Sequence, residues 1–158
     1  YGTILGGERH FFKSESEYRK YKQLPLGILA FRVAIGYMYN LDKINDLPTG
    51  YLFHLGGQTS LRGWSKPSKY ENPNGDLISD LVNVEYRFPI RKKIGGEIFI
   101  DSGRLYDDIA KFTASKLTWN WGVGIIYNTT LGPIRIDIGF PYGDMSKIQP
   151  HASLLYMF

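Results

Sequence analysis

The side chains most often used in catalysis and metal binding are sparse in this chain. The sequence has no cysteine, and its three histidines, His10, His54 and His151, lie far apart without the spacing of a metal-binding pair. Asp101 and Gly103 form a short Asp-x-Gly, but no second acid follows at the spacing of a calcium-binding or phosphate-binding loop. We therefore predict no catalytic residues, no metal site and no cofactor.

One arginine stands in an unusual setting. Residues 56–64 read GGQTSLRGW, within a loop at about residues 40–76 that is rich in Asn, Asp, Pro, Gly and Lys. Loops of this length inside compact domains are uncommon and usually functional. Taken alone, Arg62-Gly63 is most simply a solvated arginine beside a turn glycine. Whether Arg62 has a structural role depends on the elements that surround the loop.

Those elements are predicted to be strands, because the dominant hydrophobic period along the chain is two. In residues 81–90 one face carries Val82, Val84, Tyr86 and Phe88, and the other carries Asn83, Glu85 and Arg87. The same alternation recurs along most of the sequence. The predicted strands lie near residues 10–23, 27–39, 79–90, 94–106, 117–129, 131–141 and 149–158, with a strand remnant at 1–5.

Short turns join most of these strands, so each strand reverses onto its neighbour in an antiparallel meander. Two all-β architectures fit this pattern. A soluble sandwich or barrel would bury the apolar face, whereas a transmembrane barrel would turn it toward lipid around a polar lumen. The period alone does not choose between them.

Three features favour the membrane barrel. Charged residues occupy the polar face of nearly every strand, the loops are longer on one side than on the other, and aromatic residues gather near strand ends. The net charge of +4 is spread among acids rather than concentrated in a basic stripe, so we predict no nucleic-acid partner.

Five segments in a fixed order carry a family resemblance. They are FHLGGQTSLRGW (53–64), NVEYRFPI (83–90), IFIDSGRLY (98–106), GVGIIYNTTLGPIRIDIGFP (122–141) and the terminal LLYMF (154–158). Together they resemble the C-terminal half of the barrel in the BamA/TamA superfamily of outer-membrane protein insertases and translocators.

The resemblance implies an all-β, antiparallel transmembrane β-barrel. Residues 1–158 would supply the last seven to eight strands of a barrel of about 16 strands, with a lumen-inserting loop at about 40–76. The N-terminal half-barrel and the periplasmic modules would lie outside this chain, which begins inside a pattern already under way. An eight-stranded barrel that closes on itself is the geometric alternative.

The resemblance also implies a site in the lumen. The loop would fold back so that its tip docks on the inner wall; the tip is Arg62, Gly63 and Trp64, and the wall partners are Glu85, Phe99, Asp101 and Gly103. Strand parity agrees, because Glu85 and Asp101 point inward from adjacent strands and two carboxylates suit a forked guanidinium. Gly56, Gly57 and Gly63 are expected to allow tight or positive-φ turns.

The last strand would be the lateral gate and the assembly signal of the barrel. Its implied residues are His151, Ser153, Tyr156 and Phe158. Ser153 stands where a glycine is common in the family, which weakens the expectation of a kink or a close backbone approach at this seam.

The function implied is insertion of proteins into the outer membrane, or protein translocation, through a gate at the C-terminal strand. Its location would be the bacterial outer membrane, and its partners would be membrane lipid, unfolded outer-membrane proteins, and accessory lipoproteins or periplasmic modules. Two alternatives stay open. The barrel could belong to a secretion transporter or anchor a fused passenger such as a patatin-like lipase, or the chain could be a soluble β-rich binding module.

Overall fold

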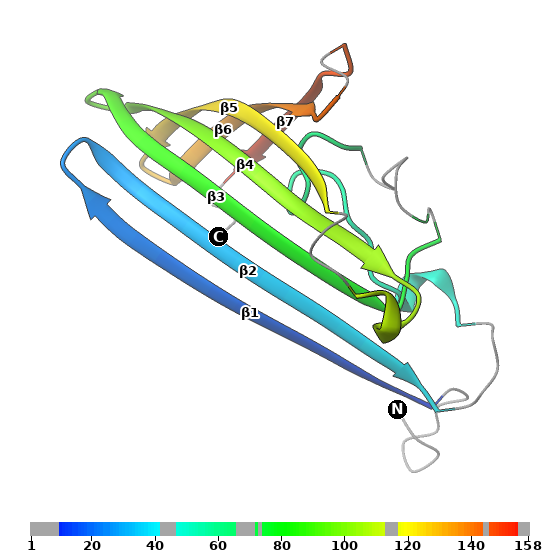
Figure 1. Ribbon diagram of the computed structural model, residues 1–158. Helices are drawn as coiled ribbons and strands as arrows, with labels where there is room; N and C mark the ends of the chain where they lie inside the picture. The colour runs from blue at the N-terminus through cyan, green and yellow to red at the C-terminus, as the bar shows by residue number, and fades with distance from the viewer. Residues whose placement is uncertain are drawn as a thin grey trace.

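Seven strands form a single antiparallel sheet in the computed structural model, which describes residues 10–41, 47–65, 72, 74–112, 117–143 and 146–154. Their order in the sheet is their order in the chain (Figure 1). The strands are β1 (Phe11–Leu24), β2 (Gly27–Asn40), β3 (Ile78–Arg91), β4 (Ile94–Tyr106), β5 (Thr118–Thr129), β6 (Gly132–Pro141) and β7 (Gln149–Leu154). The all-β meander is confirmed, while the strand remnant predicted at 1–5 lies outside the described residues.

Alternation along each strand gives the sheet two different faces. The register pairs Asn83 with Asp101 and Asp101 with Asn120, so polar residues from β3, β4 and β5 share the inner face. On the outer face Ile136 and Leu154 are 57% and 65% exposed, as expected for side chains that face lipid. Val84 is only half-buried, because it shares a shallow outward groove with larger neighbours.

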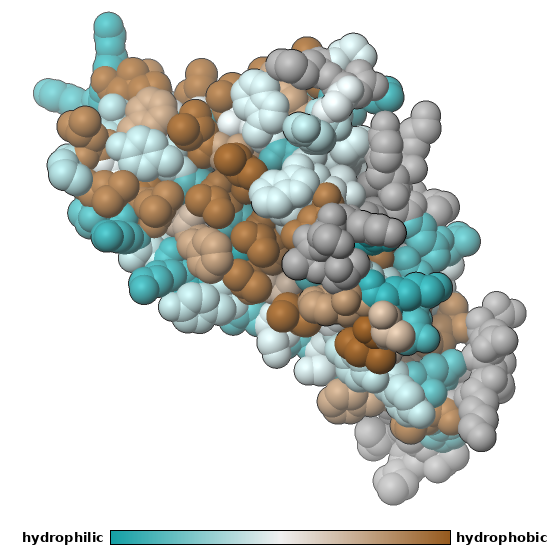
Figure 2. Space-filling view, in the orientation of Figure 1, coloured by the Kyte–Doolittle hydropathy of each residue, from teal (hydrophilic) through white to brown (hydrophobic). Residues whose placement is uncertain are grey.

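Hydrophobic side chains therefore gather on the sheet surface rather than in a single interior. Figure 2 shows them spread across the sheet in the orientation of Figure 1. Among the described residues, no helix is both long enough and apolar enough to cross a membrane.

The segment after β2 lies against the concave inner face of the curled sheet (Figure 1). Its described part contains a short 3-10 helix, η2 (Thr49–Tyr51), and an isolated bridge joins Phe53 to Asp76. A buried cluster joins this segment to the wall and consists of Met38, Phe53, Leu55, Leu61, Trp64, Leu81 and Leu105. This cluster provides the apolar part of the contact between the loop and the sheet.

The links between strands differ at the two ends of the sheet. The turns after β1, β3 and β5 are short, whereas the links after β2 and β4 are longer and the second contains η3 (Ile109–Lys111). The pairing of β3 with β4 shifts register between Pro89 and Arg91, next to a proline that cannot donate a ladder hydrogen bond.

Candidate functional site

Arg62 lies at the centre of the inner face and is 1% exposed. Its Nε and Nη2 donate to the two carboxylate oxygens of Asp101 at 2.9 and 2.6 Å, and its Nη1 donates to Glu85 Oε1 at 2.5 Å. The forked guanidinium thus meets two carboxylates from adjacent strands, which is the geometry expected from strand parity.

Two further predicted wall residues contact the loop. The guanidinium carbon of Arg62 lies 3.5 Å from the ring centroid of Phe99, close enough for a cation–π interaction. Gly103 lies beside Leu55, because a Cβ at position 103 would be 3.3 Å from Leu55 Cδ1 and 2.5 Å from the carbonyl oxygen of Asp80.

Asp101 is the most heavily bonded acceptor of the site. It accepts three hydrogen bonds from Arg62, one of them from the backbone N–H at 3.1 Å. Asn83 and Asn120 donate one more each, at 2.7 and 2.9 Å. Asn83 also donates to the carbonyl oxygen of Ser60 at 2.9 Å, so it fixes the loop and the carboxylate together.

A larger buried charge network surrounds this contact. Glu85 also accepts from Arg135 at 2.7 Å and from Arg87 at 2.5 Å, and Arg135 Nε pairs with Asp137 at 2.7 Å. The charged members are the carboxylates Glu85, Glu97, Asp101 and Asp137 and the guanidinium groups Arg62, Arg87 and Arg135. Each guanidinium group of the network therefore has a carboxylate partner that offsets the cost of burying its charge.

The state of the Arg62 guanidinium follows from the same contacts. Burial alone would lower its pKa, but the carboxylates of Asp101 and Glu85 outweigh burial and raise the pKa. Arg62 therefore stays charged and remains a permanent partner for the wall. Among the described residues, no group of three metal-ligating side chains is placed to hold an ion.

Close backbone approach brings the tip onto the wall. A Cβ at Gly139 of β6 would lie 2.2 Å from the carbonyl oxygen of Arg62, and a Cβ at Gly63 would lie 2.4 Å from Asn120 Cβ. Gly63 therefore provides space rather than a positive φ. Gly56 and Gly57 have φ of 105° and 79°, as expected for positive-φ turns.

Trp64, the last residue of the tip, is 6% exposed and belongs to the buried cluster between loop and wall. It packs with apolar residues while Arg62 takes the charged contacts. The tip thus presents one polar and one apolar anchor to the sheet.

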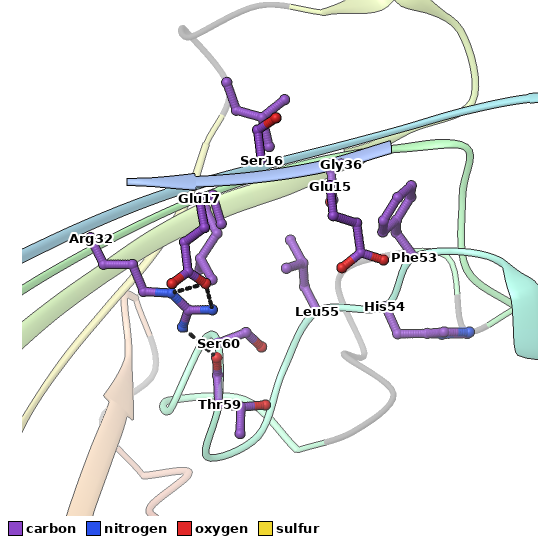
Figure 3. Close-up of a pocket in the computed structure, with 14 residues that line it drawn as sticks. Glu15, Ser16, Glu17, Arg32, Gly36, Phe53, His54, Leu55, Thr59 and Ser60 are labelled. Carbon is purple, nitrogen blue, oxygen red and sulfur yellow. Dashed lines mark hydrogen bonds and ion pairs between the residues drawn. The ribbon is translucent and has the colours of Figure 1, made fainter. Parts of the chain in front are cut away.

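A second attachment lies nearer β1 and was not assigned to the loop from sequence. Arg32 of β2 donates to the carbonyl oxygen of Thr59 at 3.0 Å and to Glu17 at 2.8 Å (Figure 3). These residues line a pocket between strands β1 to β3 and the loop. The pocket is lined by residues of the strands and of the loop, so this part of the loop also contacts the sheet.

The last strand reaches the tip through His151. Its Nε2 lies 2.7 Å from the carbonyl oxygen of Arg62, and because a carbonyl only accepts, Nε2 must carry the hydrogen. Ser153 also has inward parity and pairs in register with Arg135. Tyr156 and Phe158 lie outside the described residues.

Several network residues were expected on the inner face without being assigned to the tip. They are Arg32, Asn83, Arg87, Glu97, Asn120, Arg135 and Asp137. The alternation of the strands predicts that these side chains lie on the inner face, but it does not predict which residues they contact.

Residues 1–152 match the family model described as the Omp85 superfamily domain. The chain belongs to the Omp85 superfamily. This result confirms the family resemblance, and the β-barrel architecture and outer-membrane location expected with it.

A curated relative and a solved structure agree with the Omp85 assignment. The chain is 27% identical over 162 aligned residues to "Outer membrane protein assembly factor BamA" of Nitratidesulfovibrio vulgaris, covering 96% of this chain and 20% of the relative. It is similar in fold to the crystal structure of BamA from Haemophilus ducreyi lacking POTRA domains 1-3, with a TM-score of 0.73 and 12% identity, over 92% of this chain and 34% of that one. The chain thus spans about a fifth of the length of the curated relative.

Proposed function

We propose that this chain forms the C-terminal part of the barrel of an outer-membrane protein assembly factor. The observation that carries the proposal is the buried contact of Arg62 with Asp101 and Glu85, made by a loop tip inside an Omp85 domain. The relative whose name states outer-membrane protein assembly supports the same function.

The mechanism needs no bond chemistry. β7 is the last strand of the sheet, and among the described strands it pairs only with β6. An edge strand offers unpaired backbone N–H and C=O groups, on which an incoming client strand can be templated by β-augmentation. We assign the lateral gate to this edge, with His151 and Ser153 facing the lumen.

The loop tip serves to keep the wall in register. Desolvation offsets much of the attraction within a buried ion pair, so net stabilisation is a weak reason for such a contact. Removing one partner is different, because it leaves the other charge buried at a cost of about 3 to 5 kcal/mol. The tip, Arg62 with Gly63 and Trp64, therefore stabilises one arrangement of the wall formed by Glu85, Phe99, Asp101 and Gly103 against others.

The partners follow from the two faces of the sheet. Lipid contacts the outer face, and unfolded outer-membrane proteins are the clients of the edge. The loop at about 40–76 inserts into the lumen. The N-terminal half-barrel, the periplasmic modules and accessory lipoproteins would supply the remaining parts of the assembly and lie outside residues 1–158. A secretion transporter, or an anchor for a fused passenger such as a patatin-like lipase, is the second candidate because it would share this barrel.

Reconstitution of the full-length protein tests the proposal. The vesicles receive an unfolded outer-membrane protein, and its folding is followed by protease protection. We expect the wild type to accelerate folding over empty vesicles and Arg62→Ala to slow it, while Lys111→Ala at an exposed loop position does not. A wild type that releases a protein across the membrane without accelerating client folding would favour the transporter.

A further inference from the structure

The short turns at one end of the sheet expose aliphatic side chains. Leu26 follows β1, Ile90 lies at the end of β3 and Leu131 follows β5, with exposed fractions of 76%, 54% and 85%. In a meander, turns after alternate strands share one end of the sheet. Three apolar side chains therefore protrude from the same end.

Basic side chains accompany them. Lys20 and Lys22 lie on the outer face of β1, in the half of the strand that leads to its turn. Arg91 ends β3, and Lys92 and Lys93 form the turn to β4. All five are exposed. We call these five residues, with Leu26, Ile90 and Leu131, the short-turn rim.

The sequence around the three short turns contains no acidic side chain that would offset these charges. Residues 18–28, 86–96 and 126–134 contain no Asp or Glu. The nearest carboxylates along β3 and β4, Glu85 and Glu97, are 0% and 1% exposed and bind arginines in the lumen. At the opposite end, by contrast, Lys111 is paired with Asp107 at 2.6 Å.

We propose that the short-turn rim binds the phosphate groups of anionic phospholipids in the leaflet that it faces. The interleaving of aliphatic and basic side chains matches the boundary of a bilayer, where acyl chains lie next to headgroups. Figure 2 shows hydrophilic and hydrophobic residues side by side at the end where the β1–β2 and β3–β4 turns lie.

The geometry of β1 fits the same ligand. Lys20 and Lys22 lie opposite Phe31 and Leu29 of β2, so their stems can cover apolar surface while their ammonium groups reach the headgroups. In outer-membrane barrels the short turns face the periplasm, which places the rim at the inner leaflet. The inference depends on the barrel lying in a membrane and not on protein assembly.

The test measures lipid selectivity of the full-length protein. It is reconstituted in phosphatidylcholine vesicles at low salt with a trace of spin-labelled phosphatidylglycerol or spin-labelled phosphatidylcholine, and the motionally restricted fraction gives a relative association constant. We expect the wild type to prefer phosphatidylglycerol by at least about twofold, because each basic residue near the membrane surface increases the affinity for anionic lipid. High salt should remove this preference.

Two charge-matched variants identify the site. Lys92→Gln/Lys93→Gln should bring the ratio close to one, whereas Lys111→Gln/Lys147→Gln, outside the rim, should leave it unchanged. Heat-dependent migration on a gel checks that both variants are folded. No preference in the wild type, or a preference that survives in the rim variant, would overturn the proposal.

The short-turn rim could instead bind a partner protein with an acidic surface, and the same variants test this alternative. Loss of such a partner by the rim variant, with lipid selectivity unchanged, would also overturn the lipid proposal. The assay contains no client protein, so its failure is distinct from a failure of the assembly function.

Discussion

At the scale of single residues, Arg62 combines a permanent charge with nearly complete burial. Its partner Asp101 accepts from the Arg62 backbone, the Arg62 guanidinium and two asparagines. A carboxylate with this many donors is costly to replace, since its loss removes three hydrogen bonds that Arg62 donates and leaves buried donors unsatisfied.

Asp101→Asn should therefore release the tip. We expect a destabilisation of roughly 3 to 5 kcal/mol, because the change leaves a buried guanidinium without its main counter-charge. Arg62-Gly63 is itself a trypsin site, so cleavage after Arg62 should appear in the folded variant and not in the wild type, as read by mass spectrometry. Asp107→Asn, which removes an exposed carboxylate, is the control; equal protection of both variants would contradict the role of Asp101.

Gly139→Ala tests the close approach of the tip to β6. The added methyl group would lie 2.2 Å from the carbonyl oxygen of Arg62, so the tip must move. We expect a loss of about 1 to 3 kcal/mol and faster trypsin cleavage after Arg62. Gly50→Ala in the same loop meets nothing within 4 Å and should leave cleavage unchanged. An unaltered tip in Gly139→Ala would show that this contact does not position it.

The sequence supported some of these residue contacts and not others. Glu85 and Asp101 could be paired with Arg62, because strand parity and the family resemblance pointed to the same face. Asn83 and Asn120 could not be assigned to the site, since strand parity predicts the direction of a side chain but not which atoms it contacts. Their donation to Asp101 depends on the register of three strands and on the depth of the loop.

At the scale of elements, period-two alternation was sufficient to place the strands. Each predicted boundary in the described residues lies beside the observed one, because the outer face of most strands carries large apolar side chains while the inner face carries mostly small or polar ones. The register shift near Pro89 was not predicted, since it depends on how the paired strand adjusts to the missing donor.

In the described part of the chain, the side chain of His151 joins β7 to the loop tip, which yields a prediction. His151→Ala should speed hydrogen exchange of the β7 amides in the folded full-length protein, because the hydrogen bond to Arg62 O is lost. His151→Gln keeps an N–H donor and should restore part of the protection.

Gln149→Ala is the matched control for His151. Gln149 lies two residues away on the same strand and has the same inward parity. If both alanine variants exchange equally fast, strand fraying alone accounts for the effect and the contact with the tip does not order β7.

At the scale of the whole molecule, the apolar surface is turned outward and the charges inward. Ile136→Lys, in the middle of β6, should destabilise the folded barrel in lipid by about 2 to 4 kcal/mol, whereas Ile90→Lys at the short-turn end should cost no more than about 1 kcal/mol. Urea titration in vesicles measures both. Equal costs at the two positions would argue against a depth-dependent lipid environment for this face.

The position of Arg62 in the chain bears on the order of assembly. Its side-chain and carbonyl partners Glu85, Asp101 and His151 lie 23, 39 and 89 residues further along, so every one of them is synthesised and exported after the arginine. During export the guanidinium has no buried counter-charge to meet, and an early collapse of the loop is disfavoured. Docking of the tip can be completed only when β7 has arrived, which would make it a checkpoint that distinguishes a barrel containing β7 from one truncated before it.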